Sequence, residues 1–142
     1  MLIQQCSPLV ARTFIAIIFI YSGLAKMIGF SGVSQQISSV GIPIAGLVAF
    51  FTIVFEIGGG ASVLFGYKAP VGATLLVLFL IPATLVFHNP IADPTQITQF
   101  LKNLAIVGGL LLVVVYGAGP VSIDGHSSGS RTASIEKARE EV

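Results

Sequence analysis

The sequence predicts an all-α integral membrane protein, a four-helix bundle formed by a single domain at residues 1–120. Of its 142 residues 54% are hydrophobic and only 9% are charged, whereas charged residues make up about 25% of an ordinary soluble domain. Four apolar runs of about 20 residues follow one another, each long enough to cross a hydrocarbon core about 30 Å thick at about 1.5 Å per residue. The first partner that the sequence predicts is therefore the lipid bilayer.

The first span is expected at residues 9–29, and it holds two cations. Arg12 lies near its start and Lys26 near its end. Long basic side chains near helix ends can extend their charge to the membrane interface. For Lys26, an interfacial anchor and a role inside the bundle both remain open. Arg12 lies about a turn inside the span, and we expect it to turn inward and pair with Glu56.

The segment after the first span is too polar to cross the membrane. Within residues 30–41, Val33, Ile37 and Val40 recur at three-to-four spacing, which predicts a short helix at the interface. The second span, residues 43–66, then opens at Pro43, since a helix start tolerates proline.

The third and fourth spans are expected at residues 69–88 and 99–117. Pro82 lies inside the third, where it should kink the helix, and Pro90 follows its end. After the fourth span the composition changes to a tail rich in serine, glycine and charge, residues 121–142, which we expect to be cytoplasmic and largely disordered.

The second span carries one carboxylate, Glu56, about ten residues from its C-terminal end and well inside the bilayer. A carboxylate at that depth costs free energy, so it should face other helices and have a partner. The glycines at positions 58–60 remove side chains beside it, and Gly59 is expected to let a neighbouring helix or a flat ligand come close. A structural ion pair and a functional proton-carrying site are both consistent with this pattern.

Charge placement predicts the topology. An even number of spans puts both termini on one side, and Lys68 with the basic tail lies on that side, so the positive-inside rule makes both termini cytoplasmic. Arg12 and Glu56 are then expected in one polar layer. A second layer near the outer helix ends collects the remaining polar side chains, namely Lys26, His88, Lys102 and Asn103.

Several classes of site are excluded or disfavoured. The net charge is +1 and the seven Lys and Arg residues are scattered, which argues against a nucleic-acid partner. Cys6 is the only cysteine, so no intrachain disulfide or cysteine-rich metal site is expected. His88 is the only histidine in the four spans, which disfavours bis-histidine haem, and no Gly-x-Gly-x-x-Gly motif points to a flavin or nicotinamide. We expect no metal.

A set of short motifs runs through the chain in a fixed order. It comprises Arg12, Gly23-Leu24-Ala25-Lys26, Gly41-Ile42-Pro43, Glu56-Ile57-Gly58-Gly59-Gly60, Leu64-Phe65-Gly66, Phe87-His88, Lys102-Asn103-Leu104-Ala105, Gly108-Gly109 and the exit Gly117-Ala118-Gly119-Pro120-Val121-Ser122-Ile123-Asp124. This set resembles the DoxX family, most closely its YqjF-like bacterial branch. The resemblance implies a bacterial inner-membrane protein of four helices with quinone chemistry, in some relatives as a subunit of a thiosulfate:quinone or quinol oxidoreductase.

The polar residues suit that expectation. Lys26, His88, Lys102 and Asn103 can donate hydrogen bonds to a quinone head, Glu56 with its expected partner Arg12 can relay protons, and Gly59 can admit the ring. Three phenylalanines could stack on it or face lipid, namely Phe55, Phe65 and Phe87.

The chain would then be the quinone-binding membrane subunit beside an electron-carrying partner, and we expect it to associate with that partner or with itself. The alternative is a non-catalytic membrane anchor or scaffold, or a proton-coupled carrier of a small solute.

Overall fold

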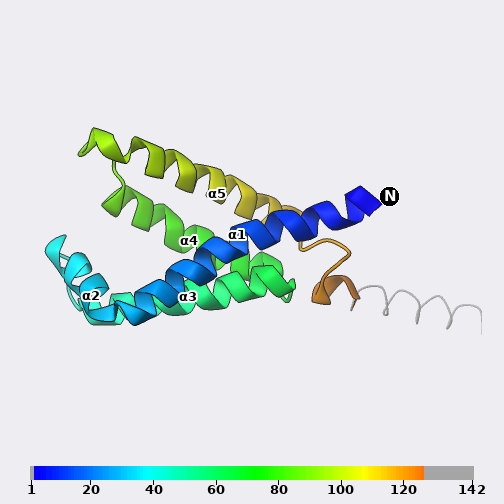
Figure 1. The fold of residues 1–142 in the computed structure, drawn as a ribbon, viewed down its shortest axis with the longest axis horizontal. Coiled ribbons are helices and arrows are strands. Elements are labelled where there is room, and N and C mark those ends of the chain that lie inside the picture. Colours follow the sequence, from blue (N-terminus) through cyan, green and yellow to red (C-terminus); the bar gives the residue numbers. More distant parts are fainter. Residues whose placement is uncertain (1, 127–142) are drawn as a thin grey trace, which may run out of the picture.

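The computed structural model describes residues 2–126, which fold into helices throughout (Figure 1). The helices in chain order are α1 (Leu2–Ile28), α2 (Phe30–Ser39), α3 (Ala45–Phe65), α4 (Ala69–Phe87), the 3₁₀ turn η1 (Pro94–Gln96) and α5 (Ile97–Tyr116). Four of them, α1, α3, α4 and α5, are long and apolar enough to cross a membrane. The predicted all-helical bundle of four spans is thus confirmed.

The helix boundaries differ from expectation mainly at two starts. Helix α1 begins at Leu2, so the polar segment before residue 9 is helical and Pro8 lies inside it. Helix α3 begins at Ala45 after Ile44, which is left-handed with φ 53°. Pro43 therefore precedes α3 and does not open it. The helix expected after the first span is present as α2, with Val40 as its C-cap.

The long helices pack in the order α1, α3, α4, α5, and α1 also contacts α5. Figure 1 shows α1 and α5 converging toward the end of the molecule that holds the N-terminus and separating toward α2. Near the middle of the bundle Gly109 of α5 leaves room for Ile15, because a Cβ there would lie 2.7 Å from that side chain. Beyond this contact the two helices diverge, and α2 packs on α3 at the open side.

Close packing between the helices depends on glycine. A Cβ on Gly23 would lie 2.6 Å from Ile57, and one on Gly60 would lie 2.9 Å from Ile20. Because lipid tails are as apolar as the side chains, the hydrophobic effect does not drive membrane helices together. They associate instead through close van der Waals contacts such as these. The α1–α3 interface is therefore built on small residues that receive the neighbour's large ones.

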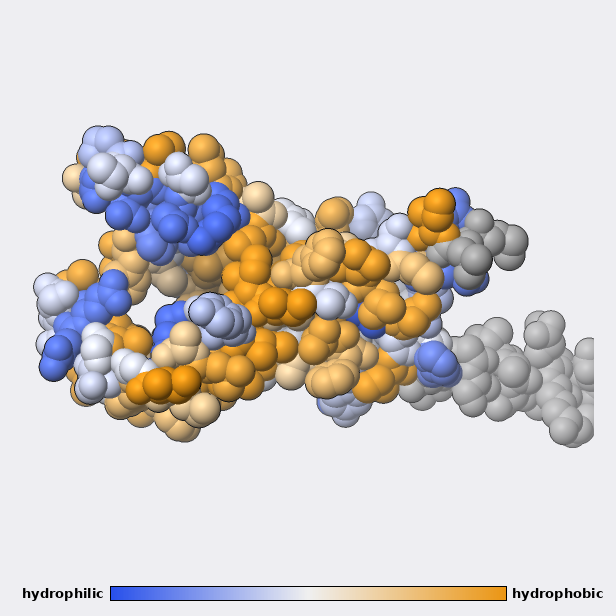
Figure 2. Space-filling model, viewed as in Figure 1, coloured by the Kyte–Doolittle hydropathy of each residue, from blue (hydrophilic) through white to orange (hydrophobic). Residues whose placement is uncertain are grey.

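A small apolar core holds the bundle together, and the outer faces are also apolar. Buried core residues include Ala16, Phe19, Val63, Ala73, Leu76, Ile106 and Leu110. Large apolar side chains are exposed all around the helices, among them Phe14, Ile17, Leu78, Leu85, Leu112 and Val115. Figure 2 shows this apolar surface over most of the helical region, with hydrophilic residues gathered at one end around a hollow. The outward apolar side chains are suited to contact lipid.

The end opposite that hollow, which we call the closed end, is held by Arg12. Its guanidinium donates to the carbonyl of Ala118 at 2.6 Å and to that of Val121, while the residue is only 3% exposed. Asp124 accepts hydrogen bonds from the backbone N–H groups of Lys68 and Ala69 at 3.0 and 3.2 Å. N–H groups at the start of a helix have no partner within the helix, so Asp124 supplies one for α4. The chain after α5 is thus fastened across the helix ends.

Two expectations change at this end. Part of the segment expected as a largely disordered tail is fastened to the bundle, since Val121 and Asp124 bond to it, while residues 127–142 of that tail lie outside the described residues. The expected Arg12–Glu56 pair is wrong. Helices α1 and α3 run antiparallel, which places Arg12 beside Gly66, about ten residues or roughly 15 Å along α3 from Glu56.

Candidate functional site

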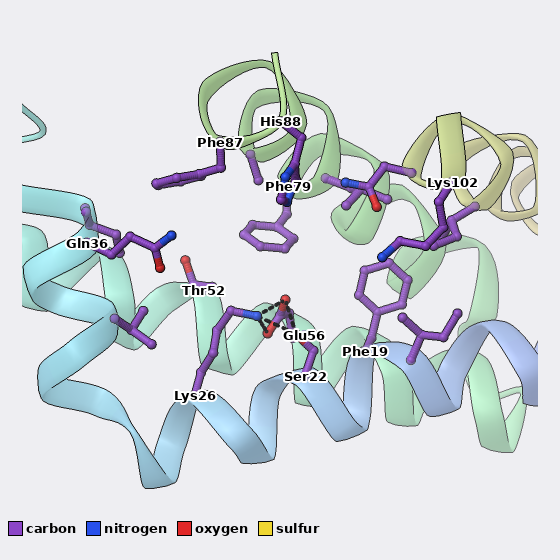
Figure 3. Close-up of a pocket in the computed structure, with 17 residues that line it drawn as sticks. Phe19, Ser22, Lys26, Gln36, Thr52, Glu56, Phe79, Phe87, His88 and Lys102 are labelled. Carbon is purple, nitrogen blue, oxygen red and sulfur yellow. Dashed lines mark hydrogen bonds and ion pairs between the residues drawn. The ribbon is translucent and has the colours of Figure 1, made fainter. Parts of the chain in front are cut away.

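A cavity of about 270 Å³ opens at the end of the bundle where α1 and α5 separate. All five α-helices contribute to its wall. Its polar lining residues are Ser22, Lys26, Gln36, Thr52, Glu56, His88, Lys102 and Asn103, and its aromatic ones are Phe19, Phe79 and Phe87 (Figure 3). The cavity therefore places a group of polar side chains inside an otherwise apolar membrane bundle.

An ion pair between Lys26 and Glu56 forms one wall of the cavity. The ammonium Nζ lies 2.9 Å from both Oε1 and Oε2 of the carboxylate, and Nζ also donates to the hydroxyl of Ser22. Ser22 in turn donates to Oε1 at 3.2 Å. Glu56 is 4% exposed, whereas the Lys26 side chain is 28% exposed. The carboxylate that the sequence singled out is thus buried and paired.

The helix geometry explains why Lys26 is the partner. Gly23 lies level with Glu56, since a Cβ added to it would be 3.2 Å from that of the glutamate. Lys26 is one turn further along α1, and helical side chains lean toward the N-terminal end of their helix. Its long stem therefore folds back over Ser22 to the carboxylate. The expected separation of Lys26 and Glu56 into two polar layers is wrong for this reason.

Asn103 of α5 and Thr84 of α4 form a buried polar contact in the wall. The Asn103 amide donates to the Thr84 hydroxyl at 2.9 Å, and that hydroxyl donates to the carbonyl of Leu80 at 2.6 Å. Asn103 is 8% exposed. One of the two N–H groups of the amide is bonded to Thr84, which orients the side chain, and the amide oxygen makes no hydrogen bond within residues 2–126. Asn103 therefore offers one acceptor and one N–H donor beside the cavity.

His88 sits at the end of α4 and is oriented by the segment that follows. Its Nδ1 lies 2.8 Å from Oε1 of Gln96. Since an amide oxygen can only accept, Nδ1 carries the proton and Nε2 of the neutral ring has the lone pair. The segment is itself fixed by Asp93, whose carboxylate accepts from the backbone N–H of Thr95 at 3.0 Å and from its hydroxyl at 2.7 Å. These hydrogen bonds hold the pKa of Asp93 below its ordinary value.

The cavity continues sideways to the outer surface of the bundle. Lys26, Val33 and Lys102 belong both to the cavity and to a shallow groove on the lipid-facing side of α1. The groove is completed by Ile17 and Tyr21, which are largely exposed. The cavity and the groove thus adjoin each other between α1 and α5, on the lipid-facing side of the bundle.

The structure brings together most of the site residues that the sequence predicted. Five of them line the one cavity, namely Lys26, Glu56, His88, Lys102 and Asn103. Arg12 does not, because it fastens the closed end. Gly59 does not either, because its open side is filled by Leu76 of α4, only 2.7 Å from where a Cβ would be. Gly59 and Gly60 therefore serve helix packing and leave no room between the helices for a flat ring, whereas Gly58 faces open space.

The two alternatives left open for the phenylalanines are divided among them. Phe87 lines the cavity, whereas Phe55 and Phe65 are exposed on the outer faces. Phe19 and Phe79 take their place.

Sequence reasoning did not identify these two rings, nor Ser22, Gln36 and Thr52. A signal existed for two of the polar residues. Ser22 precedes Lys26 by four residues and Thr52 precedes Glu56 by four, which places each on the same helix face as its charged neighbour. Within residues 2–126 no group of three or more His, Cys, Asp and Glu residues is placed to hold a metal ion.

Comparison with known proteins identifies the class. The sequence model of the DoxX family matches residues 7–89, from α1 to the end of α4. The chain belongs to the DoxX family, and its four apolar spans make it a multi-pass membrane protein of that family. The predicted resemblance is confirmed. The matched part contains Lys26, Glu56 and His88, while Lys102 and Asn103 lie beyond it in α5.

Two relatives resemble nearly the whole chain. It is 34% identical to inner membrane protein YqjF of Escherichia coli K12 over 122 residues, covering 86% of this chain and 92% of that one. It is 30% identical to inner membrane protein YphA of the same organism, covering 82% and 86%.

A third relative matches in part. ER-derived vesicles protein ERV29 of Saccharomyces cerevisiae is 35% identical over 81 residues, which is 54% of this chain and 26% of the yeast protein. No solved structure matches significantly.

Proposed function

We propose that the cavity binds the head of a quinone and that the chain is the quinone-binding membrane subunit of an oxidoreductase system. The observation that carries the proposal is the meeting of five polar side chains from α1, α3, α4 and α5 around a cavity with aromatic walls that adjoins a groove on the lipid-facing side. A quinone dissolves in the bilayer and has a flat ring with two carbonyl oxygens. It matches this cavity in solubility, shape and hydrogen bonding.

The roles of the residues follow from their geometry. Lys102 can donate to one carbonyl oxygen of a bound ring, and His88 can donate to another when its ring is protonated. Asn103 accepts a hydrogen bond from a hydroxyl on the ring, so it favours the reduced form. Phe79 and Phe87 provide the apolar contact for the ring faces.

The Lys26–Glu56 pair provides a group that can exchange a proton. A carboxylate held by an ammonium and a hydroxyl can take up a proton, after which Ser22 and Lys26 still have hydrogen-bond partners. A bound quinone supplies the redox chemistry, since its ring takes up two electrons and two protons. The electrons come from a partner subunit in this proposal, and Glu56 delivers protons to the cavity.

Quinone binding by the purified full chain tests the proposal. A short-chain ubiquinone or menaquinone analogue is titrated against the protein in mild detergent, with thermal shift and tyrosine fluorescence quenching as readouts. We expect saturable binding that His88→Ala weakens by about tenfold, the loss of one hydrogen bond to the ring. Glu56→Gln should impair proton delivery more than affinity, because the carboxylate bonds to Lys26 and Ser22. His126→Ala is the matched control, because His126 contacts Ser122 at the closed end. No saturable binding by the folded protein would overturn the proposal.

A proton-coupled carrier of a small solute is the second candidate, favoured by the buried pair at the wall of a cavity open at one end. Here Glu56 would carry the proton and the bundle would have to open at the closed end. Locking that end by a disulfide between α1 and the segment after α5 would abolish transport by reconstituted vesicles. The same crosslink would leave quinone binding intact.

The proposed location is the bacterial inner membrane with both termini in the cytoplasm. The start of α1 and the chain after α5 lie at the closed end together, as Figure 1 shows, and Lys68 lies there too. The sequence adds Arg131, Lys137 and Arg139 to this side, and positive residues favour the cytoplasmic side. The cavity then opens toward the outer half of the membrane.

A further inference from the structure

We propose that the cavity selects an anionic ring, a quinone or phenol with an ionised ring hydroxyl, and that Lys102 binds its oxyanion. This inference rests on the proposed function and names the class of ring that the same site prefers. It starts from the charges that face the cavity. Its wall contains the ammonium groups of Lys26 and Lys102 and a single carboxylate, that of Glu56.

The ammonium group of Lys26 already bonds to side chains of the protein. Lys26 has three N–H donors, and the structure assigns two to the oxygens of Glu56 and one to Ser22. The carboxylate in turn accepts from Lys26 at both oxygens and from Ser22 at Oε1. The pair is therefore neutral as a unit and has no donor left for a ligand.

The second cation is left without an anion. Lys102 makes no hydrogen bond or ion pair with any of residues 2–126, and Figure 3 shows its side chain directed into the cavity beside Phe19. The residue is exposed at the edge of the cavity, so its ammonium group is accessible to a ligand, and a charge at this depth of a membrane protein is stabilised by an opposite one. An anionic ligand would supply that charge.

The walls indicate that the anion is carried by a ring. Phe19, Phe79 and Phe87 line the cavity, and its volume of about 270 Å³ is of the size of a one- or two-ring compound. A free inorganic anion would gain nothing from these aromatic faces, whereas a flat ring would gain contact on both sides. The arrangement of a lone ammonium next to aromatic walls thus fits a ring oxyanion.

The test compares two rings of nearly equal size. Binding of 2-hydroxy-1,4-naphthoquinone, which is an anion at neutral pH, is measured against 2-methoxy-1,4-naphthoquinone, which is neutral, by calorimetry on the full chain in detergent. We expect the hydroxy compound to bind at least tenfold more tightly, the scale of one added charge-assisted hydrogen bond. The preference should vanish when the pH falls below the pKa of the ligand's hydroxyl.

Variants at Lys102 assign the effect. Lys102→Met should remove the preference, because it weakens the hydroxy compound at least tenfold more than the methoxy compound, whereas Lys102→Arg should retain it. Lys68→Met is the matched control, since this lysine lies at the closed end.

Equal binding of the two rings to the wild type would overturn the inference while the proposed function survives. Binding of neither ring would overturn both. Displacement of the hydroxy compound by decanoate at equal concentration would overturn the choice of a ring over a lipid carboxylate.

Discussion

The two ends of the bundle use their charged residues in opposite ways. At the closed end Arg12 and Asp124 bond to backbone groups, and these contacts fasten the chain after α5 to α1 and to the start of α4. At the open end Lys26, Glu56 and Lys102 face a cavity, and the pair is bonded only through side chains. The charged side chains at the closed end satisfy backbone groups and fix the fold, whereas at the cavity Lys26 and Glu56 satisfy each other and Lys102 remains available for a ligand.

Because of this difference between the two ends, substitutions at the closed end should affect stability and substitutions at the cavity should affect ligand binding. Bonds to fixed carbonyls and N–H groups have one arrangement, so their loss should appear in the free energy of unfolding. Side chains around a cavity can rearrange when a ligand enters, so their loss should appear first in affinity. Changes made at the two ends are expected to have different consequences.

The largest effect on stability is expected from Arg12→Met. The change leaves the carbonyls of Ala118 and Val121 without their charged donor in a buried place, and two such hydrogen bonds are worth about 3 kcal/mol. Denaturant unfolding in mild detergent measures the loss, and quinone binding by the folded fraction should be unchanged. Lys102→Met, at the open end, should alter stability by less than about 0.5 kcal/mol. An equal loss in the two variants would contradict the division between the ends.

A double-mutant cycle on Lys26 and Glu56 comes next. Lys26→Met leaves a buried carboxylate without its cation, which is expected to cost about 3 kcal/mol. Glu56→Gln should cost less, since the amide still accepts from Ser22 or Lys26. In the double variant most of the loss should be recovered, because no unpaired charge remains. Additive losses would show that the two residues act independently and that the pair does not form.

Asp124→Ala tests the cap at the start of α4. Its carboxylate accepts from two N–H groups of that helix start, and removal of a helix cap costs about 1 kcal/mol. Asp93→Ala is the matched control, because Asp93 is fully exposed and caps only the short turn η1. Thermal unfolding should show a clear loss for the first and almost none for the second. If Asp124→Ala lowered the stability no more than Asp93→Ala does, the contact between Asp124 and the start of α4 would not stabilise the closed end.

The smallest effect is the pH dependence at Asp93. Hydrogen bonds from Thr95 lower its pKa in the folded protein, so the unfolded chain binds the proton more readily. This contribution to stability is present above the unfolded pKa of about 3.9 and is lost as the pH falls through the lower folded value. An NMR titration of the carboxyl should give a pKa below that reference, and Thr95→Val should raise it. A titration unaffected by that substitution would contradict the assignment.

The spans were predictable because each depends on local composition. A run of about 20 apolar residues must form a helix in lipid to satisfy its own backbone, so the helices were found within a few residues of their bounds, except that α1 begins well before residue 9, at Leu2. Five candidate residues line one cavity, namely Lys26, Glu56, His88, Lys102 and Asn103. They could be selected from the sequence because each is a polar position in or at the end of an apolar run.

The pairing within the site was not predictable. Arg12 and Lys26 were both reasonable partners for Glu56 by charge, and depth counted along a helix favoured Arg12. The antiparallel register of α1 and α3 decides for Lys26, because Gly23 is the residue that lies against Glu56. The role of Gly59 was decided in the same way by the approach of Leu76 from α4.

The sequence by itself determined that this chain is a four-span membrane protein of the DoxX family with a few polar residues inside the spans. These properties depend on composition, on the length of apolar runs and on short ordered motifs. Only the tertiary structure decided that α1 and α5 diverge to form a cavity, that Lys26 neutralises Glu56 and that Arg12 closes the opposite end. Register, rotation and side-chain reach depend on how neighbouring helices pack, and the spacing of residues along one helix does not contain that information.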